Sequence, residues 1–145
     1  MKKFDFRLES VLKVRALRKK MAEREVAQTQ ASLNKADREL ENVRQAYAGS
    51  FGLNLFETPN PAFAAEVLQR YREDLKKRET RLDVQRQKIN EKLTDEKKIL
   101  TYRLKDEMVM DKLKDYQKQE YMREVDGIEQ KEIEEIDLLK RGLKS

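Results

Sequence analysis

GSFGLNLFETPNP, residues 49–61, is the only segment between residues 1 and 126 that contains glycine or proline. Inside a helix, glycine costs about 1 kcal/mol and proline about 3 kcal/mol relative to alanine. Two long stretches without either residue, on each side of a segment that has both, therefore predict a helix, a turn and a second helix. We expect one domain over residues 1–145, with a first arm at about 6–48, a turn at about 49–60 and a second arm at about 61–142.

The composition favours a coiled coil over a globular domain. Of the 145 residues, 42% are charged and 38% hydrophobic, with only four glycines and two prolines. Heavy use of Ala, Glu, Lys, Leu and Arg with helical periodicity is typical of long helices. The high charge would also fit a disordered chain, but the apolar residues are periodic. We expect an all-α fold, two long helices in an antiparallel coiled-coil hairpin, the second much longer than the first.

Each arm carries a heptad seam, a row of apolar positions for the partner helix. We expect a change of heptad phase near Met21 in the first arm and another after Ile89 in the second. The first seam follows Leu8, Val11, Leu12, Val14, Leu17, Met21, Ala22, Val26, Thr29, Leu33, Ala36, Leu40, Val43 and Tyr47. The second follows Leu68, Tyr71, Leu75, Arg78, Leu82, Gln85, Ile89, Leu93, Leu100 and Leu104.

The second arm has a clear start and exceeds the first in length. Asn60 is a suitable N-cap, and Pro61 suits the first helical position, where its missing N–H is not needed. At 1.5 Å per residue, the first arm spans roughly 65 Å and the second roughly 120 Å. We therefore expect residues from about Met108 onward to lack a partner within the chain.

Several classes of function are unexpected for this composition. The chain has no cysteine and no histidine, which removes thiol nucleophiles, the usual zinc ligands and the side chain that titrates near neutral pH. It also has no phosphate-binding glycine loop. We expect no catalysis, no cofactor and no metal. No apolar run approaches the about 18 residues that span a bilayer, and the N-terminus lacks a signal-peptide core, so we expect a soluble, cytoplasmic protein.

Charge is concentrated near both ends of the chain. Residues 1–20 hold eight basic side chains against Asp5 and Glu9, and residues 124–137 hold seven acidic side chains against Lys131. Such runs can be solvated helix faces, sites for nucleic acid or anionic lipid, or docking surfaces for a protein of complementary charge. We favour the protein partner, because no aromatic platform for bases accompanies the basic run.

The opening segment FDFRLESVLKVR, residues 4–15, resembles the N-terminal signature of the FliJ family of the flagellar type III export apparatus. The acidic segment EQKEIEEID, residues 129–137, is similar to the C-terminal part of that family. The resemblance implies a helical hairpin that acts as a cytoplasmic stalk, peripheral at the inner face of the cell membrane through its partners. It implies no catalytic activity of its own, because ATP is bound by the partner.

The implied partners are the hexameric export ATPase, the cytoplasmic domain of the export gate and export chaperones. For the gate, the resemblance points to Val67 and Tyr71, although Tyr71 also fits the seam. Near the ATPase ring it places Phe4, Phe6, Arg7, Leu8, Val11, Leu12, Arg15, Arg18, Glu132 and Ile136.

Three other hypotheses stay open at the level of sequence. The chain could be a homodimeric coiled-coil scaffold in which the overhangs of two chains pair. It could be the stalk of a virulence type III secretion system. It could also be a basic helical module that binds nucleic acid or acidic membrane, whose affinity would fall steeply with salt.

Overall fold

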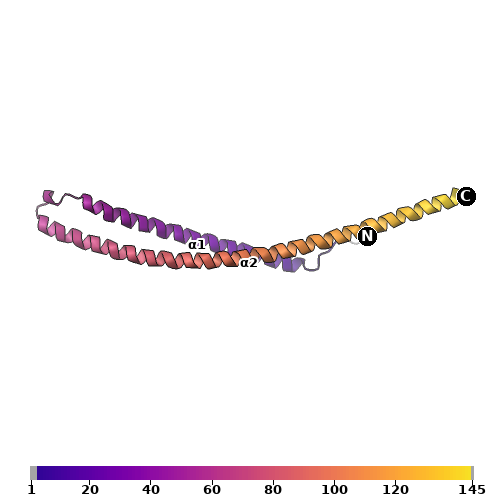
Figure 1. The fold of residues 1–145 in the computed structure, drawn as a ribbon, viewed down its shortest axis with the longest axis horizontal. Helices are drawn as coiled ribbons and strands as arrows, with labels where there is room; N and C mark the ends of the chain where they lie inside the picture. The colour runs from indigo at the N-terminus through magenta and orange to yellow at the C-terminus, as the bar shows by residue number, and fades with distance from the viewer. Residues whose placement is uncertain (1–2, 145) are drawn as a thin grey trace. The chain divides into compact units, whose positions relative to one another are not determined.

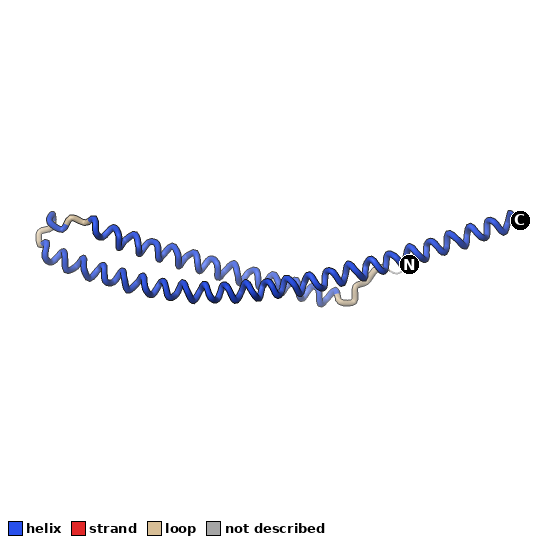
Figure 2. Tube along the Cα trace, viewed as in Figure 1, coloured by secondary structure: helices blue, strands red, loops and turns tan. Residues whose placement is uncertain are grey.

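The computed structural model describes residues 3–144, so Met1, Lys2 and Ser145 at the ends of the expected domain lie outside the described residues. Its elements are α1 (Glu9–Gly49), the short 3-10 helices η1 (Ser50–Gly52) and η2 (Leu55–Glu57), and α2 (Pro61–Lys144) (Figure 1). Residues 3–144 contain helix and loop and no strand (Figure 2). The all-helical class and the much longer second helix are thus confirmed.

The start of α2 follows the local signals in the sequence. The Asn60 side chain accepts a hydrogen bond from the backbone N–H of Phe63 at 3.2 Å, as an N-cap should, and Pro61 is the first helical residue. Helix α1 begins at Glu9, a few residues later than predicted, because residues 3–6 are not helical. Helix α2 continues through Gly127, which has no positive φ.

The contacts of the chain group into two compact units. Unit 1 comprises residues 1–20 and 101–145, of which 3–20 and 101–144 are described, and unit 2 comprises residues 21–100. Each unit contains one part of α1 and one part of α2. The single domain expected over residues 1–145 stays a prediction.

Unit 2 is held by a small apolar core between α1 and α2. Leu40, Val43, Leu75 and Leu82 are buried together, with Ala46 and Tyr47 packed against them. Two ion pairs join the helices on the outside of this core, Asp37 with Arg86, and Arg44 with Glu79 at 3.5 Å. From the first pair to the second, the residue number on α1 increases while the residue number on α2 decreases.

The predicted seam of unit 2 is correct on α1 from Ala22 onward and partly wrong on α2. Met21, also predicted as a seam residue, is 55% exposed. On α1, Ala22, Thr29, Ala36, Leu40 and Val43 are buried. On α2, Leu68, Leu75, Leu82 and Leu93 are buried, as expected. Tyr71, Arg78 and Gln85, however, are exposed.

The seam positions that lie between Leu68, Leu75 and Leu82 on α2 are instead Arg72 and Glu79, which are half-buried. Leu75, Leu82, Ile89 and Glu96 follow one another at seven-residue steps, so the predicted phase change after Ile89 does not occur. Long charged side chains can occupy seam positions because their aliphatic stems pack while their heads reach water.

Arg72 fixes the turn between the helices. Its guanidinium donates two hydrogen bonds, from Nε to Ser50 Oγ and from Nη2 to the Ser50 carbonyl, each 3.0 Å long. The same group lies 4.0 Å from the centre of the Phe51 ring, which in turn packs edge-on against Tyr47. The turn is thus tied to α2 by a charged, half-buried side chain.

We expect Arg72→Ala to lower the free energy of unfolding by about 1.5–3 kcal/mol, because two hydrogen bonds from a charged donor are lost and the Ser50 carbonyl loses its partner. Chemical denaturation followed by circular dichroism measures this. The exposed Arg81→Ala is the control and should change the value by less than about 0.5 kcal/mol. Equal effects of the two substitutions would contradict this role of Arg72.

Unit 1 has a separate core. Phe6, Leu12 and Met110 are buried together, Phe4 and Leu113 pack against them, and the Phe4 and Tyr121 rings lie 5.6 Å apart. Lys114 pairs with Glu9 at 2.8 Å and Lys19 with Glu107 at 3.0 Å. As in unit 2, the pair with the higher residue number on α1 has the lower residue number on α2.

The expectation that α2 has no partner within the chain from about Met108 onward is wrong, because intrachain contacts continue to Tyr121. The non-helical residues ahead of α1 carry Phe4 and Phe6 onto α2, so Met110 is buried and Tyr121 half-buried. Every residue from 126 to 143 is exposed. We call residues 126–143 the C-terminal segment.

Candidate partner-binding surfaces

Three of the residues expected near an ATPase ring lie inside unit 1. Phe6 and Leu12 are only 4% and 9% exposed, and Phe4 is half-buried against Tyr121. Packing along α2 satisfies their apolar side chains, so they support the surface of unit 1 and offer little surface of their own. The sequence did not separate Phe4 and Phe6 from the exposed residues, because they precede α1 and helical periodicity does not apply to them.

Arg15 also has a structural role in unit 1. It is half-buried, and its Nη1 donates a hydrogen bond of 3.1 Å to the backbone carbonyl of Asp106. The other predicted residues of this group, Arg7, Leu8, Val11 and Arg18, are exposed.

The exposed side of α1 in unit 1 carries an apolar row that faces away from the seam. Val11, Val14 and Leu17 are 38%, 47% and 58% exposed, although they were predicted as seam residues. Leu12, Arg15 and Lys19 take the side toward α2 instead. The phase change predicted near Met21 therefore does not occur: Arg15, Ala22 and Thr29 follow one another at seven-residue steps. Val11, Val14 and Leu17 form a second, exposed apolar row on the same helix. With the exposed Arg7 and Arg18 beside it, we call this row the basic stripe.

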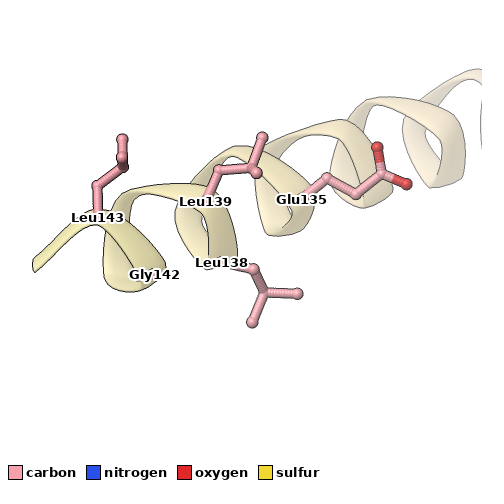
Figure 3. A pocket seen from close by; sticks show the side chains of 5 residues that line it. All are labelled: Glu135, Leu138, Leu139, Gly142 and Leu143. Atoms are coloured by element: carbon pink, nitrogen blue, oxygen red, sulfur yellow. The ribbon is translucent and has the colours of Figure 1, made fainter. Parts of the chain in front are cut away.

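The C-terminal segment contains the two predicted residues Glu132 and Ile136, both exposed. At 100° per residue, Ile133, Ile136, Leu139 and Leu143 fall on one side of the helix, with Glu129 and Glu132 among them. Figure 3 shows Leu139 and Leu143 projecting from one side of the helix and Leu138 from the other. The segment therefore presents an acidic apolar face, which we call the acidic stripe.

A third surface lies beside the turn in unit 2, where the predicted residues Val67 and Tyr71 come together. They are 50% and 46% exposed and line an open groove that we call the turn groove. Leu68, next to them, is buried, so the structure assigns Leu68 to the seam and Tyr71 to the surface. The groove is lined by Leu53, Leu55, Phe63, Ala64, Val67, Leu68 and Tyr71.

Exposed aromatic residues around the turn were not singled out from the sequence. Phe56 is 90%, Phe63 63% and Phe51 59% exposed. Of the three, Phe63 lines the turn groove, whereas Phe51 packs against Arg72 and Tyr47. Their position in a segment rich in turn residues was the signal that could have identified them.

Two other kinds of site are absent from the described part of the chain. Residues 3–144 contain no cluster of three or more Asp, Glu, His or Cys side chains that could hold a metal ion. No helix within that range is long and apolar enough to cross a membrane.

Comparisons with protein-family models, with curated proteins and with solved structures find no match to this chain.

Proposed function

We propose that the chain is a non-catalytic, antiparallel coiled-coil hairpin that acts as the stalk of the flagellar protein export apparatus. In this role its unit 1 surfaces insert into the hexameric export ATPase, and the turn groove contacts the cytoplasmic domain of the export gate. The observation that carries the proposal is that unit 1 exposes both a basic stripe and an acidic stripe. The buried core between its helices is small.

The antiparallel hairpin is supported by the order of the contacts. In unit 2 Asp37 pairs with Arg86 and Arg44 with Glu79, and in unit 1 Glu9 pairs with Lys114. In each unit the partners on α2 move toward lower numbers as α1 advances, which is the pattern of antiparallel neighbours.

The ring contact is supported by charge and exposure. Arg7, in the turn just before α1, and Arg18, on α1, are exposed near Val11 and Val14, and Glu132 is exposed near Ile136 on α2. Exposed charge of both signs makes contacts that orient a partner and form quickly while remaining exchangeable. A stalk that responds to the successive states of a ring needs contacts of this kind.

In this proposal the chain has no catalytic residue, and ATP is bound and hydrolysed by the ring. The protein works in the cytoplasm, at the inner face of the cell membrane, where the gate holds it. It contributes to flagellum biogenesis, and so to motility and chemotaxis, by transmitting the ATPase cycle to protein export and by receiving export chaperones. The stalk of a virulence type III secretion system is the nearest alternative, because it would need the same surfaces.

For the gate contact, we expect the double substitution Val67→Asp and Tyr71→Asp to weaken binding of the purified gate domain at least tenfold, because it places two charges in an apolar groove. A tenfold loss corresponds to about 1.4 kcal/mol of binding free energy. Calorimetry or surface plasmon resonance gives the dissociation constant. Val84→Asp with Tyr102→Asp changes the same residue types at exposed positions outside the groove. Equal losses in both double variants would contradict a gate contact at the turn groove.

A further inference from the structure

Unit 1 exposes two apolar rows with the same spacing. On α1, Val11, Val14 and Leu17 are 38–58% exposed, and on the C-terminal segment Ile133, Ile136 and Leu139 are 53–68% exposed. Both rows advance by three residues and then three. In the sequence the match continues after a further step of four, at Met21 and Leu143. Residue n of the C-terminal segment thus matches residue n − 122 of α1, since 133 − 11, 136 − 14 and 139 − 17 all equal 122.

The charges beside the two rows are largely opposite. In a parallel pairing of the rows, Arg7, which lies in the turn two residues before α1, corresponds to Glu129, and both are exposed. Glu135 and Arg18 occupy flanking positions of the kind that form ion pairs between coiled-coil helices. Lys13 and Lys140 form one like-charge pair against these two favourable pairs. Opposite charge therefore supports the register that the apolar spacing defines.

We propose that the occupant of each row is a second copy of this chain. The acidic stripe of one copy lies parallel to the basic stripe of the other, residue n against residue n − 122. The contact covers residues 129–143 on one helix, about 21 Å of its length.

The arrangement of unit 1 makes this contact reciprocal. Within the unit, α1 runs opposite to α2, because Glu9 meets Lys114 whereas Lys19 meets Glu107. If the acidic stripe of one copy runs parallel to α1 of the other, the two α2 helices run in opposite directions. A two-fold axis then relates the copies, and each gives one stripe of each kind, so the assembly closes as a dimer.

The opposite orientation fits less well. Reversed, the row spacing of the C-terminal segment is four, three and three, which does not match three, three and four on α1. It would also stack the copies head to tail, which gives an open chain unless a rotation closes it. The parallel register is thus favoured by spacing and by closure.

The dimer is distinct from a scaffold in which two overhangs pair with each other, and it does not depend on the proposed function. It does predict competition with any ring that uses the same surfaces, because Arg7, Arg18 and Ile136 are covered in it. A second copy would then protect these apolar rows until the partner arrives.

Disulfide cross-linking between two different single-cysteine chains tests the proposal. The chain has no cysteine of its own. One chain carries Val14→Cys and the other Ile136→Cys, both at exposed positions. In the proposed register these residues are level in the seam, where a disulfide needs Cα atoms about 4.4–6.8 Å apart. We expect mild oxidation of the mixture to give the mixed dimer as the main product on a non-reducing gel.

The matched control replaces Ile136→Cys by Leu138→Cys, which is exposed on the other side of the helix. Its mixed dimer should form at least tenfold more slowly. Equal rates in the two mixtures, or no cross-link with Ile136→Cys, would overturn the proposal. A chain with both Val14→Cys and Ile136→Cys that cross-links only within itself would also overturn it, since the C-terminal segment would then cover its own α1.

Sedimentation equilibrium provides a second measurement without cysteine. Glu129→Arg should raise the dimer dissociation constant at least tenfold, because it places like charges together at two symmetric contacts. Adding Arg7→Glu to the same chain should restore most of the affinity. A dissociation constant that neither substitution changes would contradict the register.

Discussion

In the proposed stalk role, replacing Arg7 and Arg18 together with glutamate is expected to weaken stimulation of the export ATPase by this chain at least a hundredfold. The two side chains are exposed beside the apolar row of the basic stripe, and reversing both changes the local charge by four. Like charge across an interface slows encounter and costs several kcal/mol once the partner is close. We expect the concentration needed for half-maximal stimulation to rise at least a hundredfold, measured as ATP turnover against added chain.

Arg15 is left unchanged in this experiment because it holds unit 1 together through the Asp106 carbonyl. The control is Arg78→Glu with Arg81→Glu, two exposed arginines on α2 in unit 2, which gives the same change of charge. This control should stimulate as the unmodified chain does. Circular dichroism should show equal helicity for both variants. Full stimulation by the Arg7 and Arg18 variant would contradict the assignment of this surface to the ring.

The largest effect on stability is expected at the centre of the unit 2 core. Leu40 is 2% exposed and packs with Val43, Leu75 and Leu82. Leu40→Ala removes buried methyl groups and leaves a cavity, so it should lower the free energy of unfolding by about 2–5 kcal/mol. Urea titration followed by the helical circular dichroism signal measures the change.

Leu104→Ala is the control for this substitution. Leu104 lies on α2 and is 44% exposed, although the sequence placed it in the seam. Its replacement should change the free energy of unfolding by less than about 0.5 kcal/mol. A loss at Leu104 as large as at Leu40 would show that the seam follows the predicted phase after all.

The helices and the turn could be predicted because each is encoded locally. Between residues 1 and 126, glycine and proline occur only in residues 49–61. Asn60 caps α2 and Pro61 is its first residue, which are the usual roles of these residue types. The α1 seam in unit 2 was also predictable, since Ala22, Thr29, Ala36 and Val43 recur every seven residues.

The phase of the α2 seam could not be predicted because charged residues occupy part of it. Arg72 and Glu79 take half-buried positions there, where Ser50 and Arg44 on the other side give them partners. A search that follows apolar residues alone moves to Tyr71, Arg78 and Gln85, which are exposed. The partners that make the charged positions acceptable are distant in sequence.

The candidate surfaces were predicted only in part for a related reason. Val11, Val14 and Leu17 were predicted as seam residues together with Leu12, because the sequence does not state which of two apolar rows on α1 meets α2. In the structure Leu12 is buried with Met110, and Phe4 and Phe6 extend the cover of α2 to Tyr121. Their non-helical backbone gives no periodicity from which that contact could be read.

Native mass spectrometry of the chain mixed with the hexameric export ATPase tests the stalk proposal most directly. A stalk inside a ring occupies its single central opening, so the account predicts one chain per six ATPase subunits, and none when Arg7 and Arg18 are glutamate. Six chains per hexamer, or a one-to-six complex that persists with both substitutions, would contradict it.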